Sequence, residues 1–454
     1  MLKISKLDIN PGKLVEYLRD RAGILLSRGI EVYTFPHRTF QEYLAACYLT
    51  DTEYPDLVSN LAKKDLNRWR EVMLLAAAKA VRGSESSVWI LSEELCLKDV
   101  GSCESTIERI NGAYLAAQAL LESARLDTVS ERNQEKLNRV KNWLIHIMRG
   151  DQLPAFERAN AGNLLAKLGD PRNEVMTIES MQFCFVPEGE FVMEDDRKVY
   201  LSSYYMSRYP VTQSQYQYFV EDGGYANPAF WQEAIEDGKW KDRKYEGSDQ
   251  AESYSDPLDL PNHPVVGISW YEAKAFTRWL TQKYHEQNIL PASASIRLPT
   301  EAEWEKASRG GLERPKQAII TDISAIDFNS QNIQFIANEN KIRVYPWGDS
   351  MDNDKCNYNE TGINSTNAVG CFALGKTVYG CEEMSGNVWE WCNDWYDRYP
   401  DGIETDPVGP SSGASRAVRG GGWYDNARYC RSADRGRDAP DYRYGYRGFR
   451  LVAP

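Results

Sequence analysis

The chain has 454 residues and a formal net charge of -13, from 53 Lys and Arg against 66 Asp and Glu. This length suffices for two or three domains, and the negative charge argues against general binding to nucleic acid or to anionic membranes. The first ten residues lack the apolar core of a signal peptide, and no apolar run approaches membrane-spanning length. We therefore expect a soluble cytoplasmic protein with neither a nucleic-acid nor a membrane partner.

The thiols and imidazoles of the chain do not form a recognisable metal-binding pattern. Its nine cysteines are scattered without a C-x-x-C pair, which favours reduced, mostly buried thiols over a disulfide framework or a zinc site. The four histidines are far apart in the sequence, so a multi-histidine metal centre is not expected. They are His37, His146, His263 and His285.

Two helices and a strand are predicted in the first fifty residues. Residues 12–29 carry leucines at helical spacing before a glycine, which predicts a helix ending at Gly29. Residues 30–35, IEVYTF, predict a short strand. The next segment, FPHRTFQEYLAACYLT, predicts a helix whose apolar face is made by Phe40, Tyr43, Leu44 and Cys47.

This last segment resembles the end of the winged-helix region in NACHT-type STAND nucleotide switches, where F-x-H-x-[ST]-F-Q-E-[FY]-L-A-A recurs. The resemblance implies that His37 approaches nucleotide phosphates; a packed or capped surface histidine is the alternative, and we favour it for this chain alone. The chain has no G-x-x-x-x-G-K-[ST] loop to cradle a phosphate. We therefore expect a STAND NTPase as partner, on another polypeptide or in the same, longer one.

Residues 55–175 predict a helical connector. Apolar side chains recur at helical spacing in several segments, and PAFERANAGNLLAKLGDPR resembles a single HEAT-type repeat that ends in a Gly-Asp-Pro turn. One repeat is too few to predict a solenoid. We place the domain boundary in this turn. The predicted domains are a winged-helix-like remnant (1–54), the connector (55–175) and a C-terminal domain (176–454).

The C-terminal domain is predicted to be an irregular α+β domain with an aromatic core. Residues 183–193, FCFVPEGEFVM, predict a β-hairpin. Three short helices each follow a capping box, in which the side chains of the first and fourth residues bond each other's backbone N–H groups. These boxes are Thr212 with Gln215, Ser269 with Glu272, and Thr300 with Glu303.

The ordered motifs FVPEGEFVM, YPVTQSQY, HPVVGISWYEAKAF, RLPTEAEWEKASRGG, YPWGD, MSGNVWEWCNDWY, RGGGW and GFRLV resemble the formylglycine-generating enzyme, or sulfatase-modifying factor, family. The resemblance covers nearly all of residues 180–452 and implies a C-type lectin-like fold. It also implies copper-dependent oxidation of a sulfatase cysteine in some members, and a three-histidine iron site in others. The four histidines here do not supply that triad.

The resemblance places the two copper-binding thiols at positions 425 and 430, which here are Asp425 and Cys430. One thiolate beside a hard carboxylate is a poor Cu(I) site. We therefore expect no copper, a packed role for Cys430 and no catalysis. The alternative is a metal-dependent oxidase of the same class with altered metal chemistry.

A structural calcium ion is the metal that the resemblance supports. In the family, the S-G-N-V-W-E turn and a residue before it supply oxygen ligands, which implies the side chains of Glu383, Asn387 and Glu390 and the Ser385 carbonyl. Such hard oxygen donors suit Ca²⁺. The alternative is that these side chains only cap local backbone.

Residues 419–452 contain two kinds of sequence position, frame positions and the positions between them. Gly420 to Trp423, Cys430, Pro440, recurrent arginines and the closing GFRLV form a frame. The positions between them are mostly Tyr, Asp, Asn and Gly, a composition typical of adaptable binding surfaces; a solvated irregular loop is the alternative. The predicted ligand-binding residues are Tyr424, Asp425, Asn426, Tyr429, Asp434, Gly436, Asp438, Tyr442, Tyr444, Gly445, Tyr446 and Arg447.

This segment also resembles the ends of variable proteins of diversity-generating retroelements, in which adenines of Asn-rich repeats are randomised. Tyr and Asp are one adenine substitution from AAY codons, and Gly is two. We therefore interpret the chain as a non-catalytic sensor of a protein, peptide or glycan ligand, linked to STAND-type signalling. A structural scaffold is the third possibility, and it predicts that the tyrosines contribute to no interaction.

Overall fold

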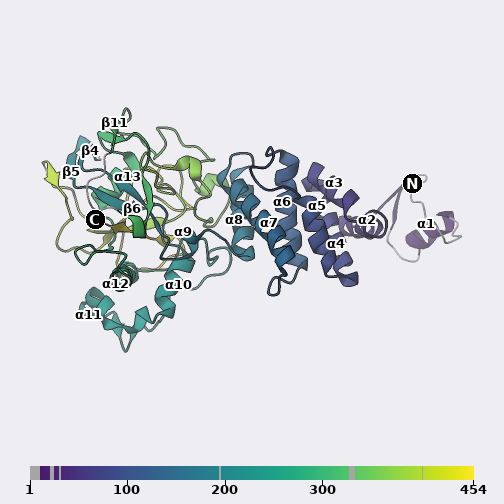
Figure 1. Ribbon diagram of the computed structural model, residues 1–454, viewed down its shortest axis with the longest axis horizontal. Coiled ribbons are helices and arrows are strands. Elements are labelled where there is room, and N and C mark those ends of the chain that lie inside the picture. The colour runs from purple at the N-terminus through teal and green to yellow at the C-terminus, as the bar shows by residue number, and fades with distance from the viewer. Residues whose placement is uncertain are drawn as a thin grey trace. The chain divides into compact units, whose positions relative to one another are not determined.

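A computed structural model describes residues 11–20, 25–29, 32–193, 196–326, 333–400 and 402–453. Its contacts divide the chain into two compact units, Met1–Trp143 and Leu144–Pro454. The chain has the predicted α+β class, with a helical N-terminal region followed by an irregular C-type lectin-like domain (Figure 1). None of the helices in the described ranges is both long and apolar enough to cross a bilayer.

The first described elements correct one prediction. They are α1 (Pro11–Asp20), β1 (Leu26–Gly29), β2 (Val32–Thr34) and α2 (Arg38–Thr52). The helix predicted over 12–29 is wrong at its end, because β1 pairs antiparallel with β2 and brings Leu26 opposite Thr34. The β-branched residues Val32 and Thr34 favour such a strand. Residues 21–24 of the predicted helix and residues 30 and 31 of the predicted strand lie outside the described residues.

Helix α2 forms as predicted, but its predicted apolar face is not the buried one. Phe40, Tyr43 and Leu44 are 45%, 51% and 46% exposed. The buried residues are Ala46 and Leu49, and α2 packs against α4. Periodicity alone could not choose between the two faces, because apolar residues occur on both. His37 is the residue before α2, and its ring lies 6.2 Å from that of Phe40.

The remaining helices of this region pack side by side (Figure 1). They are α3 (Asp56–Lys64), α4 (Leu66–Gly83), α5 (Ser86–Leu95), α6 (Ile107–Ser123) and α7 (Glu131–Arg149). Apolar residues that recur at helical spacing in this region, among them Val72, Met73, Tyr114 and Ala117, are buried as predicted. A Cβ atom on Gly112 of α6 would lie 2.2 Å from a carbonyl oxygen of α5, so only glycine permits this approach.

Helix α8 (Ala155–Leu168), the HEAT-like segment, packs within the C-terminal unit. Its Ala155 and Ala159 share a buried cluster with Cys371 and Phe372. Its Arg158 is fully buried and donates to the Cys371 carbonyl (3.3 Å), among other acceptors. The predicted domain ranges stay predictions, but these contacts join α8 to the domain that follows it.

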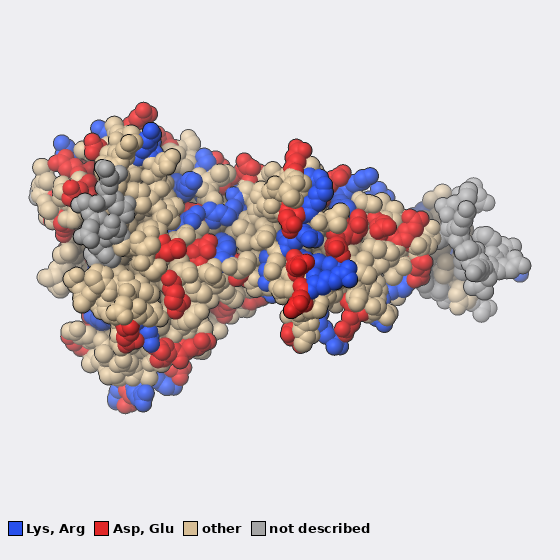
Figure 2. Space-filling model, viewed as in Figure 1, with Lys and Arg blue, Asp and Glu red and all other residues tan. Residues whose placement is uncertain are grey.

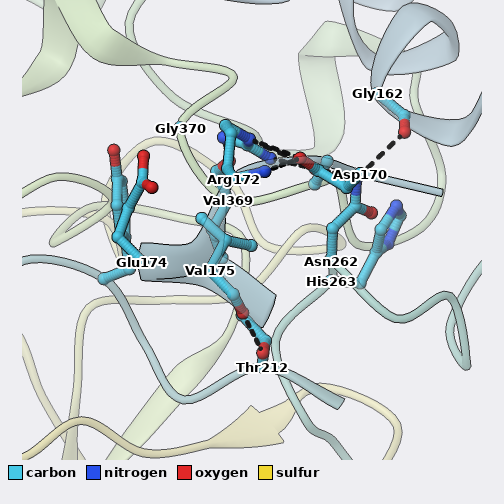
Figure 3. A network of polar contacts seen from close by, with 12 residues as sticks. Gly162, Asp170, Arg172, Glu174, Val175, Thr212, Asn262, His263, Val369 and Gly370 are labelled. Carbon is cyan, nitrogen blue, oxygen red and sulfur yellow. Dashed lines mark hydrogen bonds and ion pairs between the residues drawn. The ribbon is translucent and has the colours of Figure 1, made fainter. Parts of the chain in front are cut away.

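The turn after α8 is held by a buried polar network (Figure 3). Arg172 donates to the Asp170 carboxylate (2.6 Å) and to the Val369 carbonyl (2.8 Å), and Asn262 donates to the same carboxylate (2.8 Å). Next to them His263 is hydrogen-bonded on both ring nitrogens, and its burial lowers its pKa to about 3. His263 is therefore a neutral, packed histidine.

The C-terminal unit contains two four-stranded sheets. The first has the order β10-β3-β6-β17 and the second β15-β14-β12-β16; a three-stranded sheet has the order β13-β5-β4. The strands of these sheets are β3 (Gln182–Val186), β4 (Gly189–Val192), β5 (Lys198–Leu201), β6 (Tyr204–Ser207), β10 (Ile320–Asp322), β12 (Trp389–Trp395), β13 (Glu404–Thr405), β14 (Arg416–Arg419), β15 (Arg435–Asp438), β16 (Arg447–Gly448) and β17 (Val452–Ala453). Two two-stranded sheets, β7 (Trp240–Lys241) with β8 (Lys244–Tyr245) and β9 (Glu313–Pro315) with β11 (Phe335–Ala337), complete the set in the described ranges of this unit.

The predicted hairpin over residues 183–193 is wrong in its pairing. Both strands exist, but β3 lies between β10 and β6, whereas β4 pairs with β5. Since both edges of β3 are occupied by these distant strands, β4 has no edge of β3 to pair with.

All three predicted capping boxes are confirmed. Thr212, Ser269 and Thr300 begin α10 (Gln213–Glu221), α12 (Trp270–Glu286) and α13 (Glu301–Arg309), each with reciprocal bonds to its fourth residue. Helices α10 and α12 lie on one side of the C-terminal unit (Figure 1). The short helices are α9 (Asn173–Met176), α11 (Gln232–Glu236) and the 3-10 turns η2 (Gly224–Ala226), η3 (Pro228–Phe230), η4 (Ile323–Ala325), η5 (Asn359–Thr361) and η6 (Ala373–Gly375).

The core of this unit is aromatic, as predicted. Phe219 of α10 meets Phe276 and Trp279 of α12 edge-on at 6.0 and 5.6 Å. Phe276 in turn meets Phe449 at 5.4 Å, and both Phe449 and Leu451 are fully buried. The closing GFRLV segment is therefore part of the core, and it anchors the loops that precede it. On the face shown in Figure 2, acidic and basic side chains of the described residues are interspersed rather than grouped by sign.

Candidate ligand-recognition site

The C-terminal loops are mounted on the second sheet. The chain leaves β14, forms the loop 420–434, returns as β15, and forms the loop 439–446 before β16. Gly421 begins the first loop with φ +75°, and a Cβ atom there would lie 2.8 Å from the Tyr429 carbonyl oxygen. A side chain at position 421 would therefore be strained and would collide with the loop.

Buried and partly buried arginines hold these loops in place. Arg419 is fully buried and bonds the Glu305 carboxylate (2.5 Å) and the Ser432 carbonyl (2.8 Å). Arg435 forms a bidentate pair with Glu301, at 2.6 and 2.7 Å. Arg443 and Arg450 pair in the same way with Glu272 and Glu390. Such forked pairs fix both position and orientation.

Four of the five tyrosines predicted to bind ligand form a row of ring contacts, and the fifth, Tyr429, lies against Trp389. We call Tyr424, Tyr429, Tyr442, Tyr444 and Tyr446 the tyrosine surface. Tyr424 and Tyr446 have ring centroids 4.4 Å apart, and Tyr444 stacks on Tyr446 at 5.0 Å. Tyr442 meets Tyr444 edge-on at 5.8 Å. Tyr424, Tyr429 and Tyr442 are 40%, 40% and 48% exposed, so large aromatic area faces solvent on a supported base.

Two charged residues of the predicted ligand-binding set, Asp425 and Arg447, lie below the tyrosine surface and contact Trp389. The Asp425 carboxylate accepts bonds from Trp389 Nε1 (2.7 Å) and Gly422 N (2.9 Å), and burial raises its pKa. Arg447 is only 6% exposed, because it pairs with Asp438 (2.5 Å) and lies 5.3 Å from the Tyr446 ring centroid. Arg447 thus supports the tyrosine surface from below.

The copper positions of the family do not fit copper in this chain. The Asp425 oxygen atom Oδ2 already accepts two hydrogen bonds. Cys430 is fully buried, and a hydrogen bond to Cys356 together with burial raises its pKa well above the ordinary value. Cys356 and Cys430 belong to one buried cluster, although they come from separate segments of the chain.

The predicted calcium residues fit calcium only in part. Glu383 is nearly buried, and its Oε2 atom has no partner among the described residues. Burial and the neighbouring Glu382 raise the pKa of Glu383 to about 8, as expected for a carboxylate whose charge lacks compensation. Ser385 and Asn387 are in the same buried turn. A cation at Glu383 would supply the missing compensation.

Glu390 does not fit as a calcium ligand. Its Oε2 atom accepts bonds from Arg450 Nε and Trp304 Nε1, both at 2.6 Å, and its Oε1 atom accepts from Arg450 (2.8 Å). In the described ranges, no group of three or more His, Cys, Asp or Glu side chains is arranged to hold a metal ion. Any calcium site must therefore rely on amide and carbonyl oxygens beside Glu383.

Two cavities were not foreseen from the sequence. One of about 470 Å³ runs along α10 and is lined by Gln217, Glu221 and Glu252 among others. The other, of about 490 Å³, is lined by Glu301, Asp394 and Tyr399 among others, and burial raises the pKa of Asp394 to about 8. The lining of neither of these two cavities includes a residue of the tyrosine surface.

The sheets, the capped helices and the loops they support define a C-type lectin-like domain. Residues 170–454 match the model of the sulfatase-modifying factor enzyme 1-like domain, and the chain belongs to this family. Residues 4–49 match the winged helix-turn-helix domain C-terminal to NACHT.

The chain is also similar to several known proteins. The chain is 29% identical to the formylglycine-generating enzyme of Thermomonospora curvata over 305 residues, 57% of this chain and 84% of that enzyme. It is 34% identical to the formylglycine-generating enzyme of Streptomyces coelicolor over 216 residues, 44% of this chain and 55% of that enzyme. Among solved structures, Treponema denticola variable protein 1 is 22% identical with a TM-score of 0.41, covering 60% of this chain and 94% of that protein.

Proposed function

We propose that this chain is a non-catalytic recognition protein whose tyrosine surface binds a macromolecular ligand. The observation that carries the proposal is the row of ring contacts from Tyr424 through Tyr446 and Tyr444 to Tyr442, exposed at both ends, above a base of buried ion pairs. Tyrosine offers large contact area with few rotatable bonds, so little conformational entropy is lost on binding. Exposed aromatic rings of this kind suit a protein, peptide or glycan ligand.

A binding protein whose sequence is diversified needs a buried frame that stays folded while the exposed residues change. Residues 419–452 have this division between base and surface. Changes at the exposed positions Tyr424, Asn426, Tyr429 and Tyr442 would leave the buried frame intact. The proposal that residues 419–452 are diversified by a retroelement therefore has physical support. A second near-copy of the coding repeat beside a reverse transcriptase gene is the genomic observation that tests it, and the absence of both would count against it.

The winged-helix match supports a link to STAND-type signalling. A ligand held at the C-terminal domain would then bias an NTPase supplied in cis or in trans. The ligand can shift such a switch only by its difference in affinity for the two states.

The binding proposal predicts that the rings are required for recognition. The full chain is used to select binders from a random peptide display library and from a glycan array. We expect selected binders to lose affinity by at least about 100-fold, or about 2.7 kcal/mol, when Tyr424, Tyr442, Tyr444 and Tyr446 are all changed to Ala, because aromatic anchors dominate such interfaces. Affinities are measured by calorimetry.

The matched control is Tyr218→Ala, which removes a tyrosine 38% exposed on α10 outside the surface. Binders that tolerate the quadruple variant as well as they tolerate Tyr218→Ala would contradict the proposal and favour a structural scaffold.

The alternative oxidase is favoured by the family and by the identity to two formylglycine-generating enzymes. It requires turnover of a cysteine-containing sulfatase peptide that is lost in Cys430→Ser.

We also propose a structural calcium ion held by Glu383, Asn387 and the Ser385 carbonyl, without Glu390. At a calcium concentration of 100 times the dissociation constant, the ion should raise the free energy of unfolding by about 2.7 kcal/mol. Glu383→Gln should abolish this gain, since the amide cannot supply the negative charge. Chemical denaturation with calcium and with a chelator measures both values.

Glu390→Gln distinguishes the ion pair with Arg450 from the binding of calcium in this turn. It weakens the pair with Arg450, so it should lower stability equally with and without calcium while the gain from calcium persists. A gain that survives Glu383→Gln, or that disappears only in Glu390→Gln, would contradict the proposed ligand set.

A further inference from the structure

The cavity of about 490 Å³ is built from segments that are far apart in the sequence. Its lining comes from the N-terminal end of α13, from β12 and the segment after it, from Arg435 of β15, and from Arg197, which precedes β5. This volume falls in the range of small-molecule binding sites. The cavity is therefore large enough to hold a ligand, and its lining decides which kind.

Three polar groups of the lining have an atom without a hydrogen-bond partner among the described residues. The Arg197 side chain is only 10% exposed, and its Nε atom has no partner. The buried Tyr399 hydroxyl has none either. Asp394 is 6% exposed, and its Oδ2 atom accepts from the Glu301 N–H (3.0 Å), while its Oδ1 atom accepts from no described group. Buried polar groups without partners cost free energy, so a ligand that bonds them is favoured.

The charges deep in the lining are already compensated. Arg435 forms its forked pair with Glu301, and Arg197 pairs with Glu404. Burial raises the pKa of Asp394 to about 8, so this carboxyl group is mostly neutral at pH 7. A ligand with a net charge would find no buried opposite charge to pair with, which favours a neutral ligand. The other charged residues of the lining are exposed to water; they are Asp397, Arg398 and Asp406.

Guanidinium groups occupy the aromatic rings of the lining. The guanidinium carbon of Arg435 lies 3.8 Å from the Tyr399 ring centroid, and that of Arg197 lies 4.8 Å from it. The guanidinium carbon of Arg416 lies 3.5 Å from the Trp395 ring centroid. These contacts take up ring area that a flat aromatic ligand would need for stacking. Hydrogen bonding is left as the main way to hold a ligand.

We propose that this cavity binds a neutral polyhydroxylated small molecule of the size of a mono- or disaccharide. A hydroxyl group both donates and accepts, so neighbouring hydroxyls of one sugar suit the Arg197 Nε–H, the Tyr399 hydroxyl and the Asp394 Oδ1 atom together. The lining also contains Val408 and Pro410, against which the C–H groups of a sugar ring would pack.

This inference goes beyond the proposed function and does not depend on it. The ligand is a small molecule in a cavity, whereas the tyrosine surface is proposed to bind a macromolecule. The two sites are nevertheless connected, because Arg435 and Glu301 line the cavity and also hold the recognition loops. A bound sugar would therefore stabilise the base of these loops.

The experiment tests the full chain against single sugars by saturation-transfer NMR, with calorimetry for the dissociation constants. The neutral probes are glucose, galactose, mannose, N-acetylglucosamine, sucrose and trehalose, and the charged probes are glucosamine and glucuronate. We expect at least one neutral sugar to bind with a dissociation constant of about 1 mM or lower. The two charged derivatives should bind no more tightly than glucose.

Two variants remove unpartnered donors of the lining. Tyr399→Phe should weaken binding by about 10-fold, because one hydrogen bond to the sugar is lost. It should leave stability unchanged, since the hydroxyl has no partner in the described part of the chain. Arg197→Lys keeps the positive charge, removes the Nε donor and should weaken binding similarly. The matched control is Tyr396→Phe, which removes a hydroxyl outside the lining and should leave binding unchanged.

Chemical denaturation verifies that each variant is folded, and Arg197→Lys keeps the test informative if Tyr399→Phe unfolds. The proposal is overturned if no neutral sugar binds, if a charged derivative binds more tightly than every neutral one, or if binding is the same in both variants as in Tyr396→Phe. Loss of sugar binding on changing Tyr424, Tyr442, Tyr444 and Tyr446 to Ala would also overturn it, because the sugar would then belong to the tyrosine surface.

Discussion

Arg419→Ala is expected to lower the free energy of unfolding of the C-terminal unit by about 3–5 kcal/mol, the usual cost of removing one partner of a buried ion pair. Arg419 and Glu305 are both fully buried, and the guanidinium bonds Glu305 at 2.5 Å. Without it, the Glu305 carboxylate would be left in the interior with Arg309 (3.4 Å) as its one ionic partner among the described residues. Denaturant titration followed by tryptophan fluorescence measures the loss.

The loss should depend on pH in a defined direction. Burial already raises the pKa of Glu305, and the loss of Arg419 removes the largest opposing influence, so the pKa should rise further. A carboxyl group with a raised folded pKa contributes most below its unfolded pKa, and its contribution is lost as pH rises through the folded value. The deficit of Arg419→Ala should therefore be larger at pH 8 than at pH 5.

Two further variants test whether the stability loss of Arg419→Ala is caused by charge. Arg428→Ala removes an exposed arginine of the same loop and should change stability by no more than about 0.5 kcal/mol. The double variant Arg419→Met with Glu305→Gln removes both charges of the Arg419–Glu305 pair and should recover part of the loss. A deficit that is equal at both pH values and unchanged in the double variant would mean that packing, not charge, explains the role of Arg419.

Features with local causes were predictable from the sequence. The capping boxes at Thr212, Ser269 and Thr300 depend on side chains three residues apart, and all three form. The aromatic core followed from tryptophan-rich motifs of a recognisable family. The alternation of frame and variable positions in residues 419–452 likewise matches the burial of Cys430 and the exposure of Tyr429.

Features that depend on distant partners were not predictable. The β3 and β4 segments look like a hairpin, but strands far away in the sequence occupy both edges of β3. Arg447 was predicted to lie at the surface, yet it pairs with Asp438 at the end of β15 and is only 6% exposed. The contact between Cys356 and Cys430 joins two loops, and no spacing rule connects them.

The turn at Gly386 links the calcium residues to the base of the tyrosine surface, so it is the other position where a small change should have a large effect. Gly386 has φ +74°, and its N–H donates to the Gly420 carbonyl (2.8 Å). A Cβ atom there would lie 2.1 Å from the Asn357 carbonyl oxygen. Gly386→Ala therefore combines left-handed strain, about 1–2 kcal/mol, with overpacking, about 1–3 kcal/mol.

Gly362→Ala isolates the first of these two contributions. Gly362 has φ +70°, but no atom lies within 4 Å of its added Cβ. Denaturant titration should therefore show a loss of about 1–2 kcal/mol for Gly362→Ala and of about 2–5 kcal/mol for Gly386→Ala. Hydrogen exchange should show faster exchange at the Gly386 and Asn387 amides and in the loop after β14 only in the second variant. Equal losses in both variants would show that the contact with Asn357 relaxes freely, and that the turn does not transmit strain to the recognition surface.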